Sequence, residues 1–157
     1  MSYVETVLQP EEHVVYVTRL HWFVYLGAIW LLILAGAALA AAGALGNAAD
    51  QSLQLAALVI AAAFAALAVI AWLRGALRRR TTELAVTDRR VIFKRGLVRR
   101  HTIEMNLSKV ESVDVDQSIA GRIFGYGTVT IRGTGGGLEP LSNISQPLTF
   151  RNYVTAR

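Results

Sequence analysis

WFVYLGAIWLLILAGAALAAAGAL, residues 22–45, and LQLAALVIAAAFAALAVIAWL, residues 53–73, are two apolar runs without a single ionisable side chain. The short polar segment 46–52 separates them. A helix needs about 20 residues, at about 1.5 Å rise per residue, to cross a hydrocarbon core about 30 Å thick. The sequence therefore predicts a transmembrane helical hairpin, with helices over 22–45 and 53–73 and a loop over 46–52.

Two alternatives account for apolar runs of this kind. A pair of buried helices in a soluble protein would need a large protein shell, and the roughly 105 remaining residues look like a β domain with its own core. A cleaved signal peptide has a shorter apolar region and no second apolar run, and here the first run begins only after residue 21. The hairpin fits the sequence better than either.

The basic residues predict which way the hairpin faces. Residues 74–157 hold 15 of the 16 Lys and Arg, and the connector 46–52 holds none. Arg74, Arg78, Arg79 and Arg80 directly follow the second run, so the positive-inside rule places that end in the cytoplasm. Two crossings then put both termini in the cytoplasm. These arginines either fix topology alone or also contact anionic lipids, at about 1 kcal/mol each.

Small residues in the two runs predict how the helices pack. Helices in lipid associate by close packing, which small side chains permit. At spacings of three and four, such residues share one face of each helix: Gly36, Ala40 and Gly43 in the first, and Ala57, Ala61 and Ala65 in the second. We expect contact through them within the hairpin, and an alternative is contact between protomers of a homo-oligomer.

Aromatic residues mark the ends of the runs. Trp22 and Tyr25 open the first and Trp72 closes the second, as expected of anchors at the membrane interface. The absence of Asp, Glu, Lys, Arg and His from both runs argues against a proton relay, a transporter or a voltage sensor. A channel would have to form by oligomerisation.

From residue 81 the apolar pattern changes to a period of two, with turn residues at short intervals. Strands are expected near 83–87, 91–95, 102–107, 112–116 and 126–131, with a weaker one over 138–144, and Gly96 is expected at positive φ. A helix over 146–156 closes the chain, with Pro147 in its first turn. Residues 13–20 also alternate, and they form either a strand that docks on this domain or an interfacial segment. Their β-branched content favours the strand.

Several short motifs together resemble a known family. They are TDRR at 87–90, FKRG at 93–96, QS at 117–118, GYGT at 125–128 and PLTFR at 147–151. The chain is similar to bacterial pleckstrin-homology (PH) domain membrane proteins, a family formerly catalogued as a conserved membrane domain of unknown function. The resemblance implies two packed antiparallel sheets of about seven strands with a C-terminal helix. The expected organisation is an N-terminal cytoplasmic segment (1–21), the hairpin (22–73) and a cytoplasmic PH-like domain (74–157).

A second group of basic residues clusters around two consecutive hairpin turns of this domain. It consists of Arg89, Arg90, Lys94, Arg95, Arg99 and Arg100. The group either engages phosphates or is a solvated basic rim, and its two turns can lie at opposite ends of the sheet. The first β-hairpin of this domain, with its turn at 87–90, lacks the long basic loop with which eukaryotic relatives surround a phosphoinositide headgroup. Without a binding motif, a basic patch alone does not indicate nucleic acid.

Catalytic and metal motifs are missing from the sequence. The chain has no cysteine, and His13, His21 and His101 lack metal-ligand spacing. Glu111, Asp114 and Asp116 form either a cation site or an exposed acidic strand face. No nucleophile elbow is present, and GTGGG at 133–137 lacks the lysine and helix of a phosphate-binding loop. We therefore expect no enzyme, no cofactor and no metal.

These observations predict a small integral inner-membrane protein whose cytoplasmic PH-like domain is a non-enzymatic interaction or assembly module. The expected partners are the lipid bilayer, anionic lipids, and a second copy of the chain or another membrane protein. One alternative is a module that senses anionic lipid. Another is an oligomeric channel.

Overall fold

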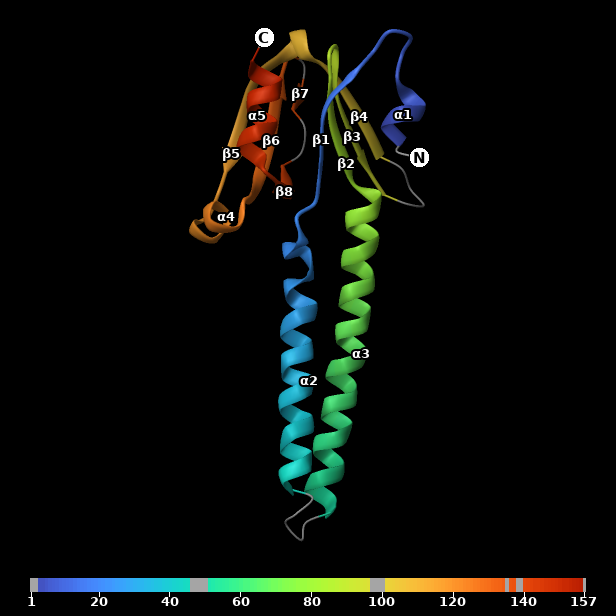
Figure 1. Cartoon of the computed structure of the whole chain (residues 1–157), viewed down its shortest axis with the longest axis vertical. Coiled ribbons are helices and arrows are strands. Elements are labelled where there is room, and N and C mark those ends of the chain that lie inside the picture. The colour runs from blue at the N-terminus through green and yellow to red at the C-terminus, as the bar shows by residue number, and fades with distance from the viewer. Residues whose placement is uncertain (1–2, 46–50, 97–100, 135, 138–139, 157) are drawn as a thin grey trace. The chain divides into compact units, whose positions relative to one another are not determined.

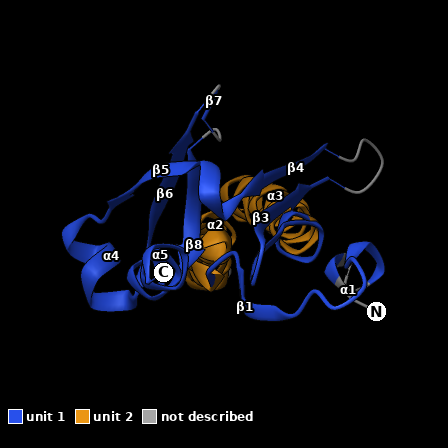
Figure 2. Cartoon of the chain, turned by 90° about the horizontal axis from the view of Figure 1, so that it is seen from above, with its two compact units in different colours: residues 1–21, 78–157 blue, residues 22–77 orange. Residues whose placement is uncertain are grey.

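The chain forms two compact units, shown in different colours in Figure 2. The computed structural model describes residues 3–45, 51–96, 101–134, 136–137 and 140–156. One unit contains residues 1–21 and 78–157, and we call it the β unit. The other contains residues 22–77 and is helical. The N-terminal segment, expected as a separate region, is therefore part of the same unit as the strands that follow the helices.

The helical unit consists of η1 (Trp22–Tyr25), α2 (Leu26–Leu45) and most of α3 (Gln51–Thr81). By length and composition, residues 22–45 and 51–81 are long and apolar enough to cross a membrane. Only 6% and 11% of their most apolar windows are buried within the chain. The second helix runs beyond the expected end at residue 73, because residues 74–81 contain good helix formers and no proline.

The two helices lie side by side (Figures 1 and 2), and their buried residues recur every seven positions. These residues are Ala28, Ala35 and Ala42 in α2, and Ala61, Ala68 and Gly75 in α3. A seven-residue repeat keeps one seam of each helix facing its neighbour. The ring of Tyr25 also packs here, since a Cβ added at Gly75 would lie 3.0 Å from its Cδ1 atom. Trp22 and Trp72 are exposed.

This seam corrects the stripe of small residues expected in α2. Gly36, Ala40 and Gly43 are exposed, and a Cβ added at either glycine would meet nothing within 4 Å. In α3, Ala61 is buried, and Ala57 and Ala65 are half-buried beside it. Alanine and glycine occur on several faces of α2, so composition alone does not predict which face packs against α3.

The β unit contains two antiparallel sheets (Figure 1). The first has the order β1 (Val14–Arg19), β2 (Glu83–Thr87), β3 (Arg90–Arg95), β4 (His101–Asn106). The second joins β5 (Val110–Asp116), β6 (Tyr126–Gly133) and β7 (Gly136–Gly137), and β8 (Leu141–Ser145) also pairs with β6. Shorter elements are η2 (Leu107–Lys109) and two helices, α1 (Tyr3–Val7) and α4 (Ile119–Phe124). The chain ends in α5 (Pro147–Thr155).

Strand β1 pairs with β2 although the whole helical unit separates them in sequence. The alternation expected over residues 13–20 is confirmed, because Thr18 is buried whereas Val15 and Val17 are exposed. The Thr18 hydroxyl donates a hydrogen bond to the Ser145 carbonyl at 2.8 Å, which links β1 to β8 of the other sheet. The apolar helices are thus an insertion between two neighbouring strands of one sheet.

The core of the β unit lies between the two sheets and α5. Its buried residues are Leu84, Val86, Val91 and Phe93 from the first sheet, Val129, Ile131, Leu141 and Ile144 from the second, and Phe150 and Val154 from α5. This confirms the predicted two-sheet fold with a closing helix. Gly96 has the expected positive φ, 98°. Helix α1 was not predicted, and its Val4 packs with Ala85 and Ile92 in a second, smaller cluster.

Candidate functional site

One end of the first sheet collects exposed basic side chains. Across this end Arg19 pairs with Glu83, Glu83 with Lys94, and Arg95 with His101. The last turn of α3 lies two residues before β2 and adds three arginines. We call this group the basic end; it consists of Arg19, Arg78, Arg79, Arg80, Lys94 and Arg95. All six are exposed except the half-buried Lys94.

The chain passes between its two units at this same end. Strand β1 ends at Arg19, and the helical unit begins at Trp22. Helix α3 ends at Thr81, and β2 begins at Glu83. The backbone N–H of Thr82 donates to the Arg78 carbonyl at 3.1 Å, so helical bonding continues almost to the first residue of the strand. The basic end is therefore defined by chain connectivity as well as by charge.

Arg90 does not belong to an exposed basic rim, and this corrects the sequence interpretation. Its guanidinium donates to both carboxylate oxygens of Glu12, at 2.9 and 2.6 Å, and to Glu104 at 2.6 Å. The Glu12 side chain is completely buried, and the Arg90 side chain is 11% exposed. The Thr87 hydroxyl donates to Glu12 at 2.7 Å, so the TDRR motif supports the fold at this position.

The charges of this pair are stabilised by each other. Burial alone would raise the pKa of the Glu12 carboxyl, but hydrogen bonds from Arg90, the Gln9 backbone and Thr87 outweigh it and lower the pKa to about 2. The hydrogen bond to Glu12, opposed by burial, raises the pKa of Arg90. Both groups are ionised at neutral pH, so Arg90 is not available to an external anion.

The other members of the expected rim are divided between the two ends of β3. Lys94 and Arg95 lie at the basic end, and Arg89 lies in the β2–β3 turn at the other end of the strand. Arg89 is exposed and lies 4.0 Å from the Asp88 carboxylate. Arg99 and Arg100 lie outside the described residues. A strand of six residues thus separates cations that are close in sequence.

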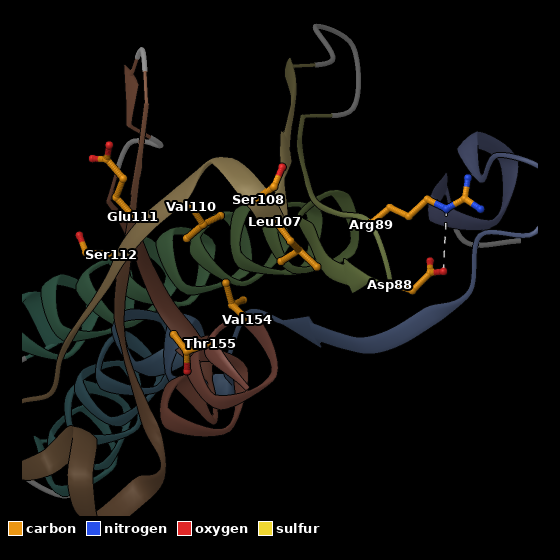
Figure 3. A pocket seen from close by; sticks show the side chains of 9 residues that line it. All are labelled: Asp88, Arg89, Leu107, Ser108, Val110, Glu111, Ser112, Val154 and Thr155. Carbon is orange, nitrogen blue, oxygen red and sulfur yellow. Dashed lines mark ion pairs between the residues drawn. The ribbon is translucent and has the colours of Figure 1, made fainter. Parts of the chain in front are cut away.

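An open hollow of about 670 Å³ lies at the end of the β unit remote from the basic end (Figure 3). In Figure 3 the side chains of Leu107, Val110 and Val154 occupy its middle, with Glu111 and Arg89 at opposite margins. Its lining mixes charges of both signs with apolar groups. This arrangement does not select one class of ligand.

The acidic strand face does not form a cation site in the described part of the chain. Asp114 is exposed and lies 3.2 Å from the Arg132 guanidinium on β6. Glu111 and Asp116 are also exposed. Among the residues that the structure describes, no three or more His, Cys, Asp or Glu side chains are grouped to hold a metal ion.

His21 connects the end of β1 to the second sheet. Its backbone N–H donates to the Asn143 carbonyl at 2.7 Å, and its ring stacks on Tyr126 with centroids 5.4 Å apart. Burial and the positive charge of Arg79 lower the pKa of the imidazole, and a hydrogen bond with the Phe124 backbone opposes them. Sequence reasoning missed the positions of Glu12 and His21, since nothing local indicates their distant partners.

A model of the family described as Bacterial PH domain matches residues 14–157. The match begins at β1 and therefore includes the inserted helices as well as both sheets and α5. Comparison with curated proteins gives no match, and neither does comparison with solved structures.

Proposed function

The chain belongs to the bacterial PH domain family, and from that premise we propose that it is an integral inner-membrane protein whose cytoplasmic domain binds the anionic lipid surface. The apolar helices cross the membrane and place both termini in the cytoplasm. The β unit is a non-enzymatic interaction module, and its basic end is the surface that contacts lipid headgroups.

The observation that carries this proposal is the position of the basic end. Its six side chains gather where residues 19–22 and 78–83 connect the β unit to the apolar helices. If those helices lie in a bilayer, this end is held within reach of the headgroups by the covalent chain. Each juxtamembrane Lys or Arg contributes about 1 kcal/mol against an anionic leaflet. At about 0.1 M salt this attraction is largely screened beyond about 10 Å.

The first test measures stabilisation by lipid. Phosphatidylglycerol added to the full chain in a non-ionic detergent is expected to raise the midpoint of thermal unfolding, because a ligand of the folded state stabilises it. Phosphatidylcholine should raise it less, and salt should remove the difference. Circular dichroism of the helices and strands gives the midpoint.

A double variant identifies the responsible surface. Arg19→Gln with Arg95→Gln, both exposed and at the basic end, should reduce the shift caused by phosphatidylglycerol. Arg89→Gln with Arg151→Gln removes the same charge from exposed positions elsewhere and should keep the shift. Equal shifts in the two double variants, or with the two lipids, would contradict lipid binding at the basic end.

A second candidate function is self-assembly, which the exposed face of α2 supports. Gly36, Ala40 and Gly43 have space beside them within the protomer, and small residues let transmembrane helices approach closely. Gly36→Leu with Gly43→Leu is expected to convert an oligomer into a monomer, as measured by light scattering in mild detergent. Gly27→Leu is the control, because at about 100° per residue Gly27 lies on the opposite face from Gly36. A wild-type monomer at all concentrations would exclude assembly.

A further inference from the structure

Helix α4 exposes three large apolar side chains to solvent. Ile119 is 80% exposed, Ile123 73% and Phe124 51%. Ile119 and Ile123 lie one turn apart on the same face of the helix. The helix connects β5 to β6 and lies beyond the ends of both strands (Figure 1). Exposed apolar side chains that gather on one short helix are a candidate contact surface for a protein or a membrane.

The surrounding residues hold α4 in a defined shape. The Ser118 hydroxyl caps the helix by accepting a hydrogen bond from the Gly121 N–H at 3.1 Å. The Gln117 amide donates to the carbonyls of Gly121 and Tyr126, at 3.3 and 3.0 Å. Gly125 ends the helix with φ at 75°, and a Cβ at Gly121 would come within 2.6 Å of the Tyr126 carbonyl oxygen. The QS and GYGT motifs therefore build this helix.

The position of α4 in the β unit indicates what covers it. The His21 ring stacks on Tyr126, two residues after the end of α4, and forms a hydrogen bond with the backbone of Phe124. Trp22, the first residue of the apolar run, follows His21 directly, and consecutive Cα atoms are about 3.8 Å apart. The apolar side chains of α4 thus belong to the end of the β unit from which the chain enters its first apolar helix.

We propose that α4 is a lipid-inserting tip, with Ile119, Ile123 and Phe124 entering the boundary between the headgroups and acyl chains of the membrane. This rests on the proposed function, because it requires the apolar helices to lie in a bilayer. It adds an apolar contact to the electrostatic one at the basic end.

The surroundings of the tip favour lipid over a protein partner. Arg122 is exposed within α4. Burial and the positive charge of Arg79, at the basic end, lower the pKa of His21, which contacts the end of α4. An apolar surface bordered by cations is typical of segments that lie in the interface of anionic membranes. A stable protein interface buries about 800 Å² on each partner, more than three side chains of a six-residue helix provide.

Site-directed spin labelling tests the proposal in the full chain, which has no native cysteine. The chain is reconstituted into vesicles of phosphatidylcholine and phosphatidylglycerol with one label, introduced by Ile119→Cys or Ile123→Cys. Power saturation measures the collision of the label with oxygen, which concentrates in lipid, and with a water-soluble nickel chelate. Glu111→Cys, at the other end of β5, is the matched control, and Val59→Cys in the apolar run of α3 reports on the bilayer.

Labels at positions 119 and 123 are expected to collide more with oxygen than with nickel, and the label at 111 should show the reverse. Nickel access at 119 and 123 together with oxygen access at 59 would overturn the lipid-inserting tip and leave the membrane location intact. Nickel access at 59 would overturn the membrane location itself and the tip with it. A third outcome is that labels at 119 and 123 are shielded from both oxygen and nickel and show spin–spin broadening, which disappears when unlabelled chain is mixed in. That result would assign the surface to contact with a second copy of the chain and overturn the tip.

Discussion

Glu12→Gln is expected to lower the free energy of unfolding of the β unit by about 3–5 kcal/mol, the usual cost of removing one partner from a buried ion pair. The Glu12 carboxylate is completely buried and accepts hydrogen bonds from Arg90, Thr87 and the Gln9 backbone. The amide of Gln matches it in size, but places N–H donors where only acceptors fit. It also leaves the nearly buried Arg90 cation with the Val7 carbonyl and the carboxylate of Glu104, whose side chain is 34% exposed.

Hydrogen exchange followed by mass spectrometry measures this loss in the full chain. Amides of β2 and β3 report the opening of the sheet in which Arg90 lies. Glu11→Gln is a matched control because it makes the same chemical change one residue earlier, at an exposed position. Similar protection of β2 and β3 in the two variants would show that the buried pair contributes little.

The same pair makes stability depend on pH. The pKa of Glu12 is about 2 in the folded chain, below its ordinary value of 4.5, so the folded state holds the ionised form more strongly than the unfolded state does. Its contribution is fully present above pH 4.5 and is lost as the pH falls from 4.5 towards 2. At about 1.4 kcal/mol per pKa unit this amounts to roughly 3 kcal/mol. Glu12→Gln should abolish this part of the acid sensitivity, and Glu11→Gln should keep it.

Phe150→Ala is expected to destabilise the β unit by about 3–5 kcal/mol, the range for removing a large buried aromatic side chain. Phe150 is fully buried between the two sheets, in the cluster that includes Leu84 and Ile131. Alanine would leave a cavity lined by residues from both sheets and α5, and these residues would fill it only in part. Exchange of amides in β2, β6 and α5 should therefore accelerate together.

The control for this change lies in the same helix. Leu148→Ala also truncates an apolar side chain of α5, but Leu148 is 46% exposed, so a loss below about 1 kcal/mol is expected. If the two substitutions accelerated exchange equally, α5 would not close the core as the structure shows. Accelerated exchange confined to α5 in Phe150→Ala would show that the helix detaches without the sheets opening.

Periodicity explains why most elements could be predicted. An alternation of apolar residues marks a strand with one buried face, and the burial of Leu84, Val86, Val129 and Ile131 follows that alternation. A run without ionisable residues marks an apolar helix, and α2 ends at Leu45 as expected. The combination of short motifs led to the PH family. All of these signals are contained in consecutive residues.

The candidate sites depended on contacts between distant residues, and here the sequence was less informative. The sequence grouped the basic residues around 89–100 and left open whether their two turns lie at one end of the sheet, whereas β3 places Lys94 and Arg95 at one end and Arg90 in a buried ion pair. Glu12 precedes Arg90 by 78 positions, and nothing local indicates that they meet. The exposure of Ile123 is equally hidden, because an isoleucine near a turn has the same sequence signature whether it is buried or exposed.

By itself the sequence determined two apolar helices and a β domain closed by a helix, because these follow from local hydrophobic pattern and chain length, and its short motifs indicated the PH family. Only the tertiary structure decided which small residues of α2 pack, that β1 completes the first sheet, which arginines are exposed, and that α4 presents its apolar side chains outward. Such choices depend on register and on the pairing of distant segments, whose energies are set by contacts that no single stretch of sequence contains.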